Sequence, residues 1–116
     1  MKFAIVGAGK VGTALARLLV DAGYGFVGAA GRSLESAQAA CRFVGSGKAT
    51  TDPAEVTRAA GLVFITTPDD VIQSVCEELA AADAFSPGTV VAHCSGALSS
   101  AILASAREAG ARVGSM

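Results

Sequence analysis

Short apolar runs alternate with amphipathic stretches along the whole chain, and this pattern predicts strands and helices in turn. The runs typical of buried parallel strands lie at 2–6, 26–30, 62–66, 89–92 and 111–114. A shorter segment within 45–50 is ambiguous and is consistent with an edge strand. Each of these five runs adjoins a glycine, a residue that favours turns.

The amphipathic stretches carry apolar residues at helical spacing. The expected helices run from the first glycine cluster to Gly23, from Ser33 to about Arg42, from Asp52 to Ala60, through the segment bearing Val71, Ile72, Val75 and Leu79, and from about Ser99 to Ala109. The apolar stripe of the first helix consists of Val11, Leu15, Leu18 and Leu19.

Two helix starts carry residues suited to capping. Ser33 is expected to be the N-cap of the second helix. Asp52-Pro53-Ala54-Glu55 supplies an N-cap aspartate, a proline at the first helical position and a glutamate three residues after the cap. This spacing predicts a capping box at the start of the third helix.

The six strand signals, separated by helices, predict an α/β fold with a doubly wound parallel sheet in the order 3-2-1-4-5-6. The crossovers are expected to be right-handed. We interpret residues 1–116 as one domain. Because the sixth strand is still forming at Ser115-Met116, we expect an N-terminal domain of a longer protein; the alternative is a complete single-domain protein.

The first strand runs straight into Gly7-Ala8-Gly9-Lys10-Val11-Gly12, which opens the first helix. This spacing between a strand and a helix is the fingerprint of a dinucleotide-binding loop. Gly7 permits the tight turn, Gly9 lets a pyrophosphate approach the backbone, and Gly12 lets the helix pack closely on the strand. The free N–H groups at the helix start attract phosphate. A tight turn without a ligand is the alternative.

The end of the second strand distinguishes between nicotinamide cofactors. NAD sites usually place Asp or Glu there, about 20 residues past the glycines, but positions 31–33 hold no acid. Arg32 can pair with a 2′-phosphate, and Ser33 at a helix start can also hold phosphate oxygens. The sequence therefore predicts NADP rather than NAD. The alternative for Arg32 is a solvated surface side chain.

In such a sheet, ligands bind outside the carboxyl ends of the strands, beside the first strand. Thr66-Thr67-Pro68 follows the fourth strand there, and its hydroxyls and backbone are expected to line the path from adenosine to nicotinamide. Ordinary sheet packing is the alternative for Thr66. Asp69 or Asp70 is expected to be an N-cap rather than an acid catalyst.

His93-Cys94-Ser95-Gly96 follows the fifth strand and contains two candidates for chemistry, Ser95 and His93. An adjacent His93–Cys94 pair is unsuited to act as base and nucleophile, because neighbours on a strand point to opposite faces. Ser95 is expected to touch the nicotinamide or a polar group of the substrate. His93 either orients a substrate or is a satisfied buried histidine, and Cys94 is expected to be a packing residue.

Composition narrows the function classes further. Charged residues make up 16% of the chain, the net charge is −1 and no basic run occurs, so we expect no nucleic-acid partner. No apolar stretch reaches membrane-spanning length, so we expect no membrane association. The cysteines are odd in number and widely spaced, which is typical of reduced thiols in a cytoplasmic protein. With one histidine and no C-x-x-C pair, we expect no metal site.

Three segments together resemble a known group of proteins. Residues 7–16, Gly31-Arg32-Ser33 and Thr66-Thr67-Pro68-Asp69 resemble the NADP-binding domain of deazaflavin-dependent NADP reductases and pyrroline-carboxylate reductases. Residues 92–98 and the ending Gly114-Ser115-Met116 resemble more closely a two-domain bacterial family with a Rossmann-like N-terminal domain and a helical C-terminal domain of unassigned function.

This resemblance implies a Rossmann fold and a place for Ser95 near the substrate. The residues that it implies as cofactor contacts are Gly7, Gly9, Lys10, Val11, Gly12, Arg32 and Ser33. In the related reductases a helical domain completes the active site and usually the dimer, so a homodimer is expected for the full-length protein.

The leading hypothesis is the NADP-binding domain of an oxidoreductase that transfers hydride between NADP(H) and a small-molecule substrate. The alternative is a non-catalytic nucleotide-binding or redox-sensing module. An S-adenosylmethionine methyltransferase is disfavoured, because the second strand lacks an acidic end for the ribose.

Overall fold

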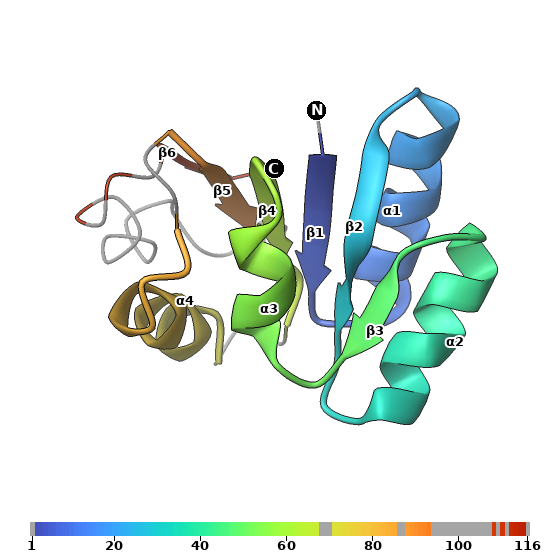
Figure 1. The fold of residues 1–116 in the computed structure, drawn as a ribbon, viewed down its shortest axis with the longest axis horizontal. Coiled ribbons are helices and arrows are strands. Elements are labelled where there is room, and N and C mark those ends of the chain that lie inside the picture. The colour runs from blue at the N-terminus through green and yellow to red at the C-terminus, as the bar shows by residue number, and fades with distance from the viewer. Residues whose placement is uncertain are drawn as a thin grey trace.

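A computed structural model of the chain describes residues 2–67, 71–85, 88–93, 108, 110 and 112–115. Its parallel strands form one sheet in the order β3-β2-β1-β4-β5-β6, as predicted (Figure 1). Helices α1 and α2 cover one face of the sheet, and α3 and α4 cover the other. Most of the helix predicted over 99–109 lies outside the described residues.

The observed elements follow the predicted ones closely. The strands are β1 Lys2–Val6, β2 Gly25–Ala30, β3 Lys48–Thr50, β4 Leu62–Ile65, β5 Val90–His93 and β6 Arg112–Ser115. The helices are α1 Lys10–Asp21, α2 Leu34–Val44, α3 Pro53–Arg58 and α4 Ile72–Ala81. The ambiguous segment within 45–50 contains the short edge strand β3.

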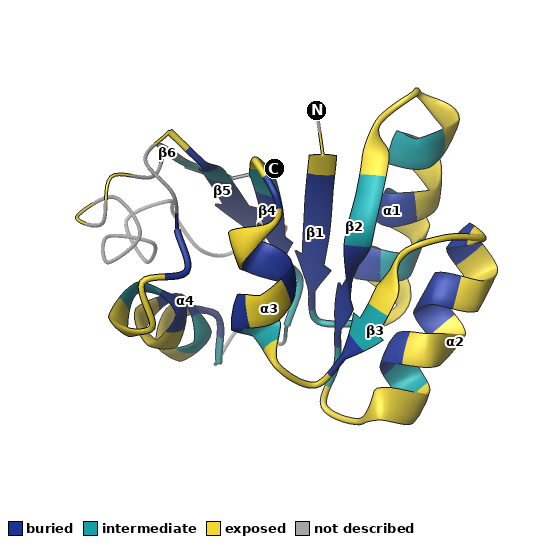
Figure 2. Ribbon diagram, in the orientation of Figure 1, coloured by how far each residue is buried: buried dark blue, intermediate teal, exposed yellow. Residues whose placement is uncertain are grey.

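Figure 2 shows that the central strand β1 is buried along most of its length. Its side chains alternate between the two faces of the sheet and build the core on both. Phe3 and Ile5 pack with buried residues of α1 and α2, whereas Ala4 and Val6 pack with buried residues of α3 and α4. All four are at most 3% exposed. A central strand buried on both faces explains why its sequence is continuously apolar.

Helix α1 approaches the sheet through small residues rather than through its whole apolar stripe. Gly12 and Ala16 are the buried positions of the helix, while Leu15 and Leu19 are half-buried and pack against the core. Val11 and Leu18 are 60% and 66% exposed. The close contact therefore depends on the absence of bulk at position 12, as the glycine pattern predicts.

The capping box predicted at α3 forms only in part. The Asp52 side chain accepts a hydrogen bond from the Ala54 N–H at 3.1 Å, as an N-cap should. Glu55 instead bonds the Lys48 ammonium, and the Asp52 N–H donates to the Thr50 hydroxyl at 3.0 Å. The predicted reciprocal bond from Glu55 to the Asp52 N–H is therefore wrong. The Lys48 ammonium binds the Glu55 carboxylate instead, and the Thr50 hydroxyl accepts from the Asp52 N–H.

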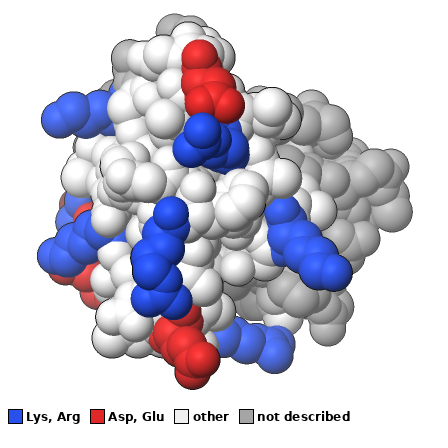
Figure 3. All heavy atoms as spheres, turned by 90° about the vertical axis from the view of Figure 1, so that its right-hand side faces the viewer, with Lys and Arg blue, Asp and Glu red and all other residues white. Residues whose placement is uncertain are grey.

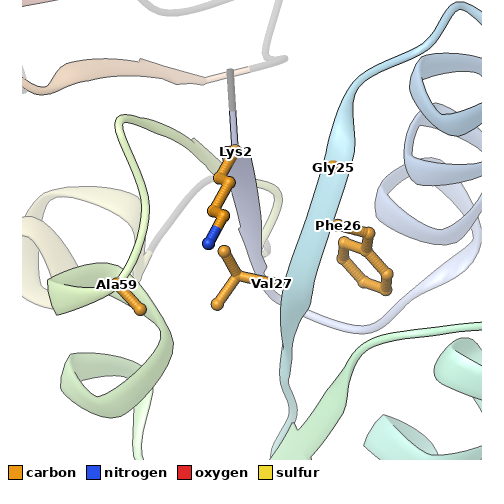
Figure 4. Close-up of a pocket in the computed structure, with 5 residues that line it drawn as sticks. All are labelled: Lys2, Gly25, Phe26, Val27 and Ala59. Atoms are coloured by element: carbon orange, nitrogen blue, oxygen red, sulfur yellow. The ribbon is translucent and has the colours of Figure 1, made fainter.

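A small cavity of about 230 Å³ lies at the amino ends of β1 and β2 (Figure 4). The side chains of Lys2 and Val27 point toward Ala59 at the end of α3, while Phe26 points to the opposite face of the sheet. The glycine loop lies at the carboxyl ends of the strands, so this cavity is separate from the predicted site. Among the described helices, none is both long and apolar enough to cross a bilayer.

Candidate functional site

The larger cavity, of about 830 Å³, lies at the carboxyl ends of β1, β2 and β4. It is lined by the glycine loop, the turn after β2, the end of β4 and one face of α4. Its described lining residues are Val6, Gly7, Ala8, Gly9, Lys10, Val11, Ala30, Gly31, Arg32, Ser36, Thr51, Pro53, Thr66, Thr67, Val71, Ser74, Val75 and Glu78. This is the edge at which open parallel α/β sheets bind ligands.

The glycine loop leaves the sheet at Gly7. Its N–H donates to the Ala30 carbonyl at 2.8 Å, and its φ of +111° lies in the region that favours glycine. A Cβ on Gly7 would lie 2.7 Å from the Thr66 carbonyl carbon and the Thr67 nitrogen. The predicted role of Gly7 in a tight turn is therefore confirmed.

Gly9 and Gly12 occupy opposite sides of the loop. Gly9 is the N-cap of α1, makes no side-chain cap bond, and has no atom within 4 Å of the place where a Cβ would be. The open space leaves the first-turn N–H groups accessible from the cavity. Gly12 lies behind the loop instead, where a Cβ would be 2.7 Å from Ile5 Cγ2, so its predicted packing role is confirmed.

The turn after β2 presents Arg32 to the cavity. Arg32 is exposed and makes no hydrogen bond or ion pair with any residue in the described part of the chain. Ser33 is the N-cap of α2, as predicted, and its hydroxyl oxygen accepts from the Ser36 N–H at 3.2 Å. Ser36 rather than Ser33 lines the cavity. Sequence reasoning missed Ser36, although its place three residues after an N-cap turns it toward the same helix end.

The two threonines after β4 have different environments. The Thr66 hydroxyl donates to the Gly7 carbonyl at 2.7 Å, so it holds the loop while lining the cavity. The Thr67 hydroxyl is buried and finds no hydrogen-bond partner among the described residues. A buried hydroxyl without a partner costs free energy unless a ligand or water satisfies it. Pro68, Asp69 and Asp70 lie outside the described residues.

Helix α4 forms the wall that sequence reasoning missed. Val71, Ser74, Val75 and Glu78 follow one another at helical spacing and all line the cavity. The two valines are half-buried, while Ser74 and Glu78 are exposed. The spacing of the two valines was the available signal, but it also fits core packing, to which Val75 contributes. The wall therefore combines an apolar surface with a single acid.

His93, one of the two residues proposed for chemistry, does not line the large cavity. The observed β5 ends one residue later than predicted, so His93 lies within the strand and is fully buried. His93 has an interaction partner, and it does not line the cavity. These observations favour the satisfied buried histidine over the residue that orients a substrate. Cys94 and Ser95 lie outside the described residues.

The described cysteines, Cys41 and Cys76, lie outside the cavity lining. Cys41 is free and buried, and burial raises the pKa of its thiol against a smaller opposing hydrogen bond from Ala29. No group of potential metal ligands occurs within the described ranges. Figure 3 shows that the described Lys and Arg side chains on the α1–α2 face stand apart from one another. Arg17 on this face pairs with Asp21 at 3.5 Å.

The arrangement suits an elongated ligand that carries phosphate. Lys10 and Arg32 bring positive charge to the side of the cavity formed by the glycine loop and β2, and Glu78 is the one acid in the described lining. The helix start adds N–H donors and a partial positive charge between them. The apolar wall of α4 supplies a surface for an uncharged, flat group. The cavity is therefore suited to phosphate and to an aromatic ring at the same time.

The fold of this chain recurs in solved structures of dehydrogenases and reductases. Synechocystis arogenate dehydrogenase superposes with a TM-score of 0.76 at 24% identity, over 94% of this chain and 37% of that chain. Salmonella typhimurium 3-hydroxyisobutyrate dehydrogenase gives 0.76 at 20% identity, over 97% and 40%. The Streptomyces aurantiacus imine reductase gives 0.75 at 24% identity, over 97% and 39%.

This chain therefore spans less than half the length of each of these three proteins. No curated protein sequence matches it. A family model for the Rossmann-like domain matches residues 1–113, which is nearly the whole chain. The match agrees with the observed strand order and with the glycine loop between β1 and α1. The chain belongs to the Rossmann-like domain family.

Proposed function

We propose that the chain binds NADP(H) in the large cavity and serves as the cofactor domain of an oxidoreductase. The observation that carries the proposal is a single cavity bounded by the open Gly9 turn, the start of α1 and the guanidinium of Arg32. A bound NADP(H) supplies hydride chemistry at its nicotinamide ring. The substrate is proposed to be a small molecule, and the hydride passes between it and the cofactor.

The residues present fit such a cofactor. The absence of any atom near a Cβ at Gly9 leaves room for a diphosphate beside the backbone. The buried Thr67 hydroxyl, unpartnered among the described residues, is available to a polar atom of the ligand. Val71 and Val75 offer apolar surface across the cavity for the adenine ring. These residues bind and orient the cofactor.

Arg32 and Ser36 support NADP over NAD. A guanidinium pairs with a phosphate by charge-assisted hydrogen bonds, and the Ser36 hydroxyl lines the cavity on the same side. No acid among the described lining residues of this turn is available for ribose hydroxyls. The resemblance of the glycine loop and Gly31-Arg32-Ser33 to deazaflavin-dependent and pyrroline-carboxylate reductases supports the same cofactor.

Two further properties of the protein are proposed. Related reductases use a helical domain to complete the active site and the dimer, so we propose a homodimer. The free, buried thiol of Cys41 supports a reducing compartment, for which we propose the cytoplasm.

Calorimetric titration with NADPH and NADH tests the cofactor. We expect NADPH to bind at least tenfold more tightly, a difference of about 1.4 kcal/mol. Arg32→Ala should weaken NADPH binding by about tenfold or more and leave NADH binding unchanged, because only NADPH carries the 2′-phosphate. Arg42→Ala is the matched control: it removes the same charge from an exposed position on α2 that does not line the cavity.

Each unfavourable result has its own meaning. An equal loss of affinity for both dinucleotides in Arg32→Ala would refute the role of Arg32 at the 2′-phosphate. If the unsubstituted chain binds neither dinucleotide, the proposed cofactor is wrong.

A further inference from the structure

Gly7 is held from two neighbouring strands at the point where the loop leaves the sheet. Its N–H donates to the carbonyl of Ala30 at the end of β2, at 2.8 Å. Its carbonyl accepts from the hydroxyl of Thr66, just after β4, at 2.7 Å. The Thr66 N–H meanwhile donates to the Val6 carbonyl at 2.8 Å, which continues the pairing of β1 with β4. The hydroxyl thus adds one contact to the loop beyond the last backbone bond.

The surroundings of Thr66 are too close to admit additional side-chain atoms. A Cβ at Gly12 would lie 2.4 Å from the Thr66 Oγ1, and one at Gly7 would lie 2.7 Å from the Thr66 carbonyl carbon. The first and third glycines of the loop therefore both lie directly against Thr66. The hydroxyl also lies 3.4 Å from the Val6 carbonyl, a longer and weaker alternative to its bond with Gly7.

We propose that Thr66 is a positioning residue for the cofactor loop, an inference that rests on the proposed function. Its hydroxyl fixes the Gly7 carbonyl, and through it the backbone of residues 8–10, which line the cavity. Without the hydroxyl, the Gly7 carbonyl loses this partner and the loop start is held by β2 alone. The diphosphate of the cofactor then meets amides that are no longer preorganised.

The test compares two ligands on matched variants of the full chain. Thr66→Val keeps the shape of the side chain and removes the hydroxyl, whereas Thr66→Ser keeps the hydroxyl. Thr57→Val is the control, because the Thr57 hydroxyl also donates to a backbone carbonyl, that of Pro53, at 2.8 Å. Thr57 is 1% exposed and does not line the cavity. NADPH spans the glycine loop, whereas adenosine 2′-monophosphate carries the adenine ring and the 2′-phosphate but has no diphosphate to contact the loop.

Thr66→Val should weaken NADPH binding by about tenfold while changing the affinity for adenosine 2′-monophosphate by less than about twofold. Thr66→Ser should bind NADPH within about threefold of the unsubstituted chain. Thr57→Val should lower the unfolding midpoint without changing the ratio of the two affinities. Unchanged NADPH affinity in Thr66→Val, or an equal loss for both ligands, would overturn the proposal.

Amide hydrogen exchange in the ligand-free protein separates this inference from the proposed function. Thr66→Val should accelerate exchange at Gly7 and Thr13, whose N–H groups are hydrogen-bonded at the two ends of the loop, and Thr57→Val should not. If the unsubstituted chain binds no nucleotide, the proposed function is wrong, and so is the role of Thr66 in cofactor binding. The amide exchange rates still decide whether the Thr66 hydroxyl holds the loop. Unaltered exchange would refute that hold. If Thr66→Val does not fold, Thr66→Ala removes the same hydroxyl with less bulk and carries the same expectations.

Discussion

Replacing Gly12 with alanine is expected to destabilise the protein, although alanine is the better helix former. Gly12 is buried in the first turn of α1. The added methyl carbon would lie 2.4 Å from Thr66 Oγ1, 2.6 Å from the Gly7 carbonyl oxygen and 2.7 Å from Ile5 Cγ2. All three distances are below the separations that real Cβ atoms show, so at least one neighbour must move.

The structure indicates how costly that movement is. Ile5 is 1% exposed and packed in the core, and the Gly7 oxygen belongs to the backbone, so neither yields easily. The Thr66 hydroxyl can rotate away only by breaking its bond to Gly7. Overpacking costs about 1–3 kcal/mol and the lost bond about 1, while alanine returns about 1 through helix propensity. The net loss of unfolding free energy is therefore about 1–3 kcal/mol.

Urea unfolding followed by far-ultraviolet circular dichroism measures this loss, since the chain has no tryptophan. The midpoint should fall by about 1 M at a typical urea dependence. Gly9→Ala is the matched control: its φ is −84° and no atom lies within 4 Å, so its stability should change by less than about 0.5 kcal/mol. A Gly12→Ala midpoint equal to or above that of Gly9→Ala would refute the packing argument.

Two further predictions concern the start of α3. Asp52→Ala removes the cap bond to Ala54 and should cost about 1 kcal/mol in the same urea assay, whereas Asp21→Ala, at an exposed ion pair, should cost less than about 0.5. The bond from Lys48 lowers the pKa of the Glu55 carboxyl from its usual 4.5, so its contribution to stability is present above pH 4.5 and is lost as the pH falls through the lower folded value. Melting temperatures from pH 2 to 7 should show that Lys48→Met reduces this acid-side slope, and an unchanged slope would contradict the assignment.

Local chemistry was sufficient to predict the framework of the site. The turn at Gly7, the close packing at Gly12 and the cap at Ser33 each depend on a backbone or side-chain requirement within a few residues. The sheet order then followed from the alternation of strands and helices, because right-handed crossovers leave few topologies. These features could be predicted because each has one dominant physical cause.

The rest depends on distances between elements that the sequence does not encode locally. Val11 and Leu18 continue the apolar stripe of α1 and yet are exposed, because the helix approaches the sheet on its Gly12–Ala16 side. The cavity wall of α4 was missed for a related reason. Val75 packs against the core and also lines the cavity, and helical spacing does not distinguish these two surroundings.

Glu55 and Thr66 show how a tertiary partner replaces the one that a local pattern suggests. Glu55 has the spacing of a capping box, but a lysine on the neighbouring strand offers it a charge-assisted bond, which is stronger than a bond to a neutral N–H. For Thr66 the sequence left ligand contact and sheet packing open. Its hydroxyl lines the cavity and also bonds the Gly7 carbonyl, because two glycines allow the loop to come within reach. A polar side chain at the end of a strand is therefore best interpreted together with the backbone groups that nearby glycines bring close to it.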